Sequence, residues 1–242
     1  MNNVAVKEKE EVLAEEEQVK ESTEMNLNMY KLRFGQKVYI IIKSFVERVL
    51  ALLAIIILIP ILFILAVAVK CSSKGPVFFK QERIGKKRKI FKCYKFRSMT
   101  QDAPHYESDK TFNAQSCITK VGKFMRKTSL DELGQLFNVL SGKMSIIGYR
   151  PLIANEKEMD LMRAKKGVYQ IKPGITGWAQ VNGRTQITDE QKANYDEWYL
   201  KHVSLWLDIK ILFMTVKQVV CGSDVKEDVL DDKESKKGEE DL

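Results

Sequence analysis

The chain has few of the residues that build metal clusters and disulfide-stapled folds. Its 242 residues include only two histidines and four cysteines, and the cysteines (Cys71, Cys93, Cys117 and Cys221) show no metal-ligand spacing. A structural zinc site is therefore not expected. The sequence begins without a cleavable export signal, so we expect the soluble part to stay in a reducing cytoplasm with its cysteines as thiols.

The sequence has a single long hydrophobic run, which argues against a multipass membrane protein. Residues 49–69 (VLALLAIIILIPILFILAVAV) are uncharged, and as a helix they are long enough to cross a hydrocarbon core of about 30 Å. Lysines and arginines flank the run on both sides, whereas a simple span usually has its basic excess on one side. We therefore favour a re-entrant helix that bends at Pro60 and returns to the same face. A kinked transmembrane helix is the alternative.

Net negative charge is confined to the two ends of the chain. Residues 1–24 and 223–242 each carry a net charge of −5, which leaves +18 on residues 25–222. Both ends are rich in Glu and Lys, so we expect the segments 1–30 and 223–242 to be disordered. The basic centre indicates anionic partners, namely nucleic acid, anionic lipid or phosphorylated metabolites.

The densest positive charge follows the apolar run. Nine of the eighteen residues from Lys80 to Arg97 are basic, and aromatic residues stand between them. Residues 75–79 and 90–96 have the composition of short strands around a turn at Gly85, which predicts a small β-hairpin. Because the run lies close to a membrane segment, we interpret it as a surface for anionic lipid or phosphate rather than for nucleic acid. A solvated basic hairpin is the alternative.

The rest of the sequence is mainly helical. Residues 130–140 (LDELGQLFNVL) have apolar residues at helical spacing, which predicts an amphipathic helix buried on one face. Further helices are expected at 153–165 and 189–219, and the second is apolar enough to lie partly at a membrane interface. These elements predict an α+β fold with a membrane helix in residues 31–74 and a second domain over 75–222.

Polar and turn-forming residues gather at three places in the second domain. Residues 145–151 and 172–184 concentrate turn-forming residues and each contains an arginine, which is typical of connecting loops but also of sites. Asp131 and Glu132 begin the amphipathic helix, where Ser129-x-x-Glu132 matches a capping box. The same two carboxylates, with arginines nearby, would also suit phosphoryl transfer, which needs an oxygen nucleophile, a metal and cationic clamps.

Five motifs in order resemble those of one protein family. They are GPVFFKQERIG (75–85), YKFRSM (94–99), TSLDELGQLFNVLSGKMSIIGYRP (128–151), KPGITGWAQVNGR (172–184) and SLWLDIKIL (204–212). This succession is similar to the monotopic polyprenyl-phosphate phosphoglycosyl transferases, the bacterial sugar transferases that start glycan assembly. The resemblance runs from near Lys43 to near Val220, and no other class known to us shares these motifs.

The resemblance implies a fold, a place and a reaction. The fold would be monotopic, with a re-entrant helix broken at Pro60, interfacial helices and a catalytic domain on the cytoplasmic face of the bacterial inner (plasma) membrane. The reaction would move a sugar 1-phosphate from a UDP-sugar to undecaprenyl phosphate and release UMP, which initiates capsule, exopolysaccharide or other surface glycan assembly. It would proceed through a phosphosugar bound to an aspartate, with direct single-step transfer as the alternative. Anionic lipids are expected neighbours, nucleic acid is not, and a homo-oligomer is left open.

By motif position, the resemblance also assigns roles to residues. Asp131 would be the nucleophile, and Glu132 would help to hold Mg²⁺. The predicted phosphate- and substrate-binding residues are Arg126, Arg150, Lys95, Arg97, Gln180, Asn182 and Arg184. The competing hypothesis is a non-enzymatic, membrane-anchored adaptor on the same fold, in which Asp131 and Glu132 only cap a helix.

Several positions depart from the pattern of the family, and they include Thr185 and Asp189, which stand where Asn and Trp are frequent. Ile59 stands where a serine commonly precedes the breaking proline, so a hydroxyl that would satisfy freed backbone groups is absent. Glu47 replaces the usual aspartate at the start of the helix, and Ser44 replaces a frequent arginine.

Overall fold

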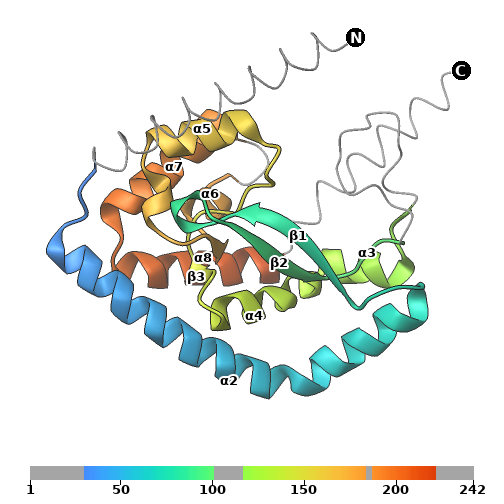
Figure 1. Cartoon of the computed structure of the whole chain (residues 1–242). Coiled ribbons are helices and arrows are strands. Elements are labelled where there is room, and N and C mark those ends of the chain that lie inside the picture. Colours follow the sequence, from blue (N-terminus) through green and yellow to red (C-terminus); the bar gives the residue numbers. More distant parts are fainter. Residues whose placement is uncertain (1–29, 101–116, 184–186, 222–242) are drawn as a thin grey trace, which may run out of the picture.

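A computed structural model of the chain describes residues 30–100, 117–183 and 187–221 (Figure 1). The predictions for the two ends, apart from Tyr30, and for Arg184 lie outside these ranges. The elements in chain order are α2 (Phe34–Ser72), β1 (Phe78–Ile84), η1 (Lys86–Arg88), β2 (Ile90–Phe96), α3 (Lys120–Lys127), η3 (Leu130–Gly134), α4 (Gln135–Leu140), β3 (Ser145–Ile147), α5 (Lys157–Lys165), η4 (Val168–Gln170), β4 (Gly174–Thr176), α6 (Trp178–Val181), α7 (Asp189–His202) and α8 (Leu205–Cys221). This is the predicted α+β, mostly helical class.

The apolar run lies in α2, a helix of 39 residues that is long and apolar enough to cross a membrane. Only 17% of its most apolar window is buried, which distinguishes it from the core helix of a soluble protein. Figure 1 shows α2 bent, with the rest of the described chain on its concave side. The helix continues through Pro60. A proline inside a helix removes one backbone hydrogen bond and kinks the axis, and here it does not end the helix. The structure thus describes α2 as one helix with Pro60 inside it, and the re-entrant path with its break at Pro60 stays a prediction.

The predicted hairpin is confirmed. Strands β1 and β2 pair antiparallel, from Phe78 opposite Phe96 to Ile84 opposite Ile90. The turn starts at Gly85, whose backbone N–H donates to the carbonyl of Lys89. Part of the basic run is used inside the protein, because Arg88 in the turn forms an ion pair with Asp160 of α5.

The two motifs at 145–151 and 172–184 meet in a second, parallel sheet. Ser145 of β3 lies opposite Gly174 of β4, and Ile147 lies opposite Thr176. The glycines after the strands allow close approach, since a Cβ at Gly177 would lie 1.8 Å from the carbonyl oxygen of Gly148. The sequence predicts loops at both places, and the structure has short strands instead. A three-residue strand whose partner is distant in sequence leaves no local pattern in the sequence.

The helices differ from the predictions in their bounds and burial. Residues 130–140 form a 3₁₀ helix, η3, followed by the short α4, in place of one amphipathic helix. The side chains of Leu133, Leu136 and Phe137 are only partly buried, while Gln135 and Asn138 are buried. The reason is that β2 lies directly against this segment, where Asn138 donates to the carbonyl of Lys92 and accepts from the N–H of Tyr94.

The helix predicted at 153–165 begins later, at Lys157, and the one predicted at 189–219 is two helices, α7 and α8. The chain turns between them at Val203, whose ψ of 122° is not helical. Helix α8 buries Leu207 and Ile211 and exposes Trp206 and Phe213. Its exposed apolar face fits the predicted interfacial helix.

Candidate active site

Asp131 and Glu132 lie in η3, next to a residue with unusual backbone geometry. Ser129 has a φ of 55°, in the left-handed region that non-glycine residues rarely adopt, and its side chain forms no cap hydrogen bond. The capping box is therefore absent, and the interpretation of this pair as a capping box is wrong. The Glu132 carboxylate instead contacts groups from outside η3.

The Glu132 carboxylate is held by two of the predicted binding residues. Lys95 of β2 donates to Glu132 Oε1 at 2.8 Å, and Arg150 lies 3.6 Å from the same oxygen. The three side chains come from β2, from η3 and from the segment after β3, so the fold gathers residues that are distant in sequence. Arg150 is about half exposed and is able to turn toward a ligand.

The Asp131 carboxylate is partly buried, and two nearby cations offset part of the cost of burying its charge. Burial raises the pKa of its carboxyl above the ordinary value, the positive charges of Lys95 and Arg126 lower that pKa, and the neighbouring Glu132 raises it. Arg126 reaches this region from α3, where its Nε donates to Ser98 Oγ at 3.0 Å. A desolvated carboxylate between cations suits a nucleophile that must meet a phosphate.

A hollow beside Glu132 is lined by a cation that the sequence reasoning missed. Its lining includes Lys95, Arg150 and Arg83, together with Gln135 and Ile175. Arg83 is partly buried, which lowers its pKa, and its Nη1 donates to the carbonyl of Pro151 at 2.8 Å. Arg83 stands in the first of the five motifs. It was not predicted as a site residue because nothing in the sequence distinguishes it from the other basic residues of the run.

Arg97 has the contacts of a helix cap. Its side chain is buried, with 6% exposed, and its Nη2 donates to the carbonyl and the hydroxyl of Ser73 at the end of α2. These bonds satisfy a helix end and fix α2 against the hairpin. The placement of Arg97 therefore gives no support to its predicted role in binding substrate.

Gln180 and Asn182 also bond to backbone. Gln180 Nε2 donates to the carbonyl of Ile175 in the wall of the hollow, and Asn182 Nδ2 donates to the carbonyl of Trp178. Neither side chain is among those that line the hollow. The contact of both residues with substrate stays a prediction.

Asp131 and Glu132 are suitable ligands for a magnesium ion whose remaining ligands would come from substrate and water. Within the described ranges, no three His, Cys, Asp or Glu side chains gather as a metal cluster. Mg²⁺ in phosphoryl-transfer sites commonly has only one or two protein carboxylates and takes its other ligands from phosphates and water. Asp131 and Glu132 supply such a donor pair, so the residues present are compatible with the predicted ion.

Comparison with known proteins gives consistent matches. A family model described as bacterial sugar transferase matches residues 38–222. The chain is 44% identical over 186 residues to the UDP-glucose:undecaprenyl-phosphate glucose-1-phosphate transferase of Klebsiella pneumoniae, covering 73% of this chain and 39% of that protein. It is 38% identical over 192 residues to the UDP-N-acetylgalactosamine-undecaprenyl-phosphate N-acetylgalactosaminephosphotransferase of Aeromonas hydrophila, covering 76% and 45%. It is also 42% identical over 170 residues to the uncharacterized sugar transferase EpsL of Bacillus subtilis, covering 69% and 81%.

The matched region is only part of several of these proteins. The chain spans about two fifths of the length of the first curated relatives that it matches. The site residues Lys95, Arg126, Asp131, Glu132 and Arg150 all lie inside the region that the family model covers.

Proposed function

Because the chain belongs to the bacterial sugar transferase family, we propose that it transfers a sugar 1-phosphate from a UDP-sugar to undecaprenyl phosphate and releases UMP. The observation that carries this proposal is the placement of Asp131 beside a carboxylate, Glu132, that Lys95 and Arg150 hold. The printed names of the relatives support the substrates. The product would begin capsule, exopolysaccharide or other surface glycan assembly.

The proposed reaction has two steps at Asp131. A carboxylate oxygen of Asp131 attacks the β-phosphorus of the UDP-sugar, and the bond from that phosphorus to the oxygen bridging the two phosphates breaks. UMP leaves with the bonding electrons, and the sugar phosphate remains on Asp131 as an acyl phosphate. An oxygen of undecaprenyl phosphate then attacks the same phosphorus and frees the Asp131 carboxylate.

The other residues have binding roles in this proposal. Arg126 and Arg150 contact phosphate oxygens, for which guanidinium groups are suited because they donate two parallel hydrogen bonds. Lys95 holds Glu132 and lowers the pKa of Asp131. Mg²⁺, held by Glu132 with Asp131, would neutralise charge on the diphosphate.

The membrane would bring the lipid phosphate to this site. The exposed apolar residues of α2 and α8 are the surfaces we assign to lipid. The basic residues on both sides of the apolar run, and the position of the protein body on the concave side of α2, support a re-entrant path at the cytoplasmic face (Figure 1). The phosphate of a polyprenyl lipid lies at headgroup height, where a site next to this surface would meet it.

UMP release tests the proposal and finds the donor. Two of the three relatives named above differ in the sugar of their names, glucose in one and N-acetylgalactosamine in the other, so a panel of UDP-sugars is required. Detergent-solubilised protein would be incubated with each donor, undecaprenyl phosphate and Mg²⁺. Release with at least one donor supports the proposal, and no release by folded protein would favour the adaptor hypothesis.

The raised pKa of Asp131 predicts how kcat/KM falls on the acidic side of its pH profile. The nucleophile must be ionised, and burial raises its pKa above the ordinary value of 3.8, so kcat/KM is expected to fall with decreasing pH at a midpoint above 3.8. Removing Lys95 takes away a charge that lowers this pKa, so Lys95→Met moves the midpoint to higher pH. The measurement is kcat/KM for UMP release across pH, with the exposed Lys92→Met as the control. A midpoint that Lys95→Met leaves unchanged would contradict the assignment of the limb to Asp131.

A further inference from the structure

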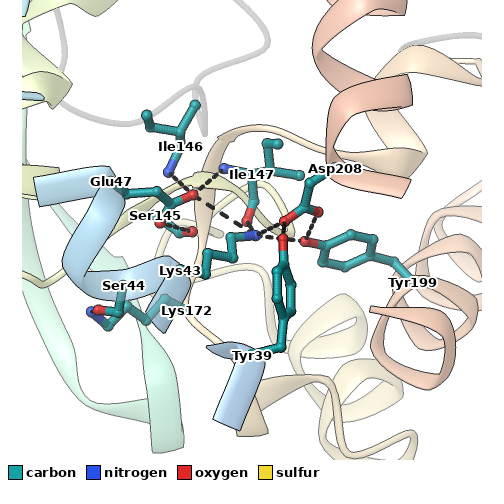
Figure 2. A network of polar contacts seen from close by, with 10 residues as sticks. All are labelled: Tyr39, Lys43, Ser44, Glu47, Ser145, Ile146, Ile147, Lys172, Tyr199 and Asp208. Atoms are coloured by element: carbon teal, nitrogen blue, oxygen red, sulfur yellow. Dashed lines mark hydrogen bonds and ion pairs between the residues drawn. The ribbon is translucent and has the colours of Figure 1, made fainter. Parts of the chain in front are cut away.

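A buried polar network joins the first half of α2 to the second sheet and to helices α7 and α8 (Figure 2). Tyr39, Lys43 and Glu47 follow one another at intervals of four residues, so they lie on one face of α2. Figure 2 shows these side chains pointing away from the helix toward β3 and toward Asp208. The network is next to the apolar run, so it marks where α2 is fixed to the rest of the protein.

Glu47 occupies the free edge of β3. Its Oε1 accepts hydrogen bonds from the backbone N–H groups of Ile146 and Ile147, at 3.1 and 3.3 Å, and its Oε2 accepts from Ser145 Oγ at 2.6 Å. The other edge of β3 pairs with β4. The carboxylate therefore connects α2 to three consecutive residues of β3, and it determines where β3 lies relative to α2.

Lys43 supplies the positive charge that this arrangement needs. Its Nζ lies 2.8 Å from Asp208 Oδ2, donates to the carbonyl of Ile147 at 2.8 Å, and is 3.8 Å from Glu47. Tyr199 donates to Asp208 at 2.6 Å, and that contact with burial raises the pKa of its hydroxyl. Buried charges add little stability compared with apolar packing. We therefore assign to this charge network the role of fixing the position of β3 along α2.

The strand held by Glu47 leads directly into the site. Two residues, Gly148 and Tyr149, separate Ile147 from Arg150, and both take part in backbone hydrogen bonds with β4 or its flanking residues. Arg150 is the residue that reaches Glu132. A shift of β3 along α2 would therefore displace the Arg150 guanidinium, and small displacements of charged groups strongly reduce catalysis.

We propose that Glu47 is a positioning residue of the transfer reaction, because it holds the free edge of β3 and thereby fixes Arg150 beside Glu132. This inference rests on the proposed function, and it assigns to the membrane helix a part in the geometry of the site. A residue that only stabilised the fold would lower the amount of folded protein and leave the action of Arg150 unchanged.

A double-mutant cycle with Arg150 tests this inference. Glu47→Ala is expected to reduce kcat/KM for UMP release on the order of tenfold to a hundredfold. In an Arg150→Ala background the same change is expected to cost less than about threefold, since the group it positions is already absent. Glu47→Asp keeps a carboxylate and is expected to recover most of the activity. Glu158→Ala, which removes an exposed carboxylate on α5, is the matched control and should leave kcat/KM unchanged.

Hydrogen exchange supplies a readout that does not require activity. Glu47→Ala is expected to speed amide exchange in the peptide 145–151, and Glu158→Ala is not. If Glu47→Ala does not fold, Glu47→Gln is used instead. It keeps one acceptor oxygen, so a smaller increase in the amide exchange rate is expected. Equal fold-losses in the two Arg150 backgrounds, or unchanged exchange in 145–151, would overturn the inference. Faster exchange in Glu47→Ala, found together with a wild-type protein that releases no UMP, would instead refute the proposed function and retain the anchoring of β3 by Glu47.

Discussion

Replacing Asp131 by asparagine is expected to reduce UMP release by roughly a thousandfold or more. The amide lacks the negative oxygen that forms the bond to phosphorus, while its size and shape are those of the carboxyl group. The measurement is UMP released per molecule of folded protein with the donor that the wild type uses. Glu132→Gln is expected to reduce release less, because Asp131 and the cations remain.

The stability of Asp131→Asn separates chemistry from unfolding. A carboxyl whose pKa is raised in the folded state contributes stability at pH values below its unfolded pKa, and that contribution is lost as the pH rises through the folded pKa. At neutral pH the ionised Asp131 is therefore destabilising, and Asp131→Asn is expected to melt at the same temperature as the wild type or above it. A folded variant that still releases UMP at the wild-type rate would rule out Asp131 as nucleophile.

Replacing Arg163 by methionine is expected to give the largest loss of stability. Arg163 Nη2 lies 2.6 Å from Asp196 Oδ2, and only 2% of each side chain is exposed. Removing the guanidinium leaves Asp196 as a buried, unpaired carboxyl, which costs about 3–5 kcal/mol. Arg163 Nη1 also donates to the carbonyl of Arg150 at 2.7 Å, so the segment that enters the site loses a support.

A second substitution tests the cause of that loss. Adding Asp196→Leu to Arg163→Met removes the stranded carboxyl, and the double variant is expected to recover a large part of the lost stability. The measurement is the thermal melting temperature in detergent for both single variants and the double variant. A double variant destabilised by the sum of the two single losses would show that the ion pair is not the cause.

Local sequence patterns predicted the local elements of this fold. The apolar run predicted α2, and the strand-like composition of the segments around Gly85 predicted the hairpin, because both depend on neighbours in sequence. The division of 189–219 at Val203 and the pairing of β3 with β4 were missed. Both depend on packing between distant segments, which periodicity does not report.

The same limit applies to the site. The motifs selected Lys95, Glu132 and Arg150, which the structure brings together. They also selected Arg97, although a basic motif does not distinguish a guanidinium that faces substrate from one that caps a helix. Glu47 was noted only as a departure from the family pattern, since its contact with β3 spans almost a hundred residues of sequence.

The central claim is that Asp131 carries the sugar phosphate during the reaction, and mass spectrometry of that residue tests it most directly. The folded protein would be incubated with Mg²⁺ and the UDP-sugar that supports UMP release, without undecaprenyl phosphate, and then digested. We expect the peptide that contains Asp131 to gain the mass of one phosphosugar, and the gain to disappear when undecaprenyl phosphate is added. Release of UMP only when the lipid is present, with no mass gain at Asp131, would contradict the claim and indicate direct transfer.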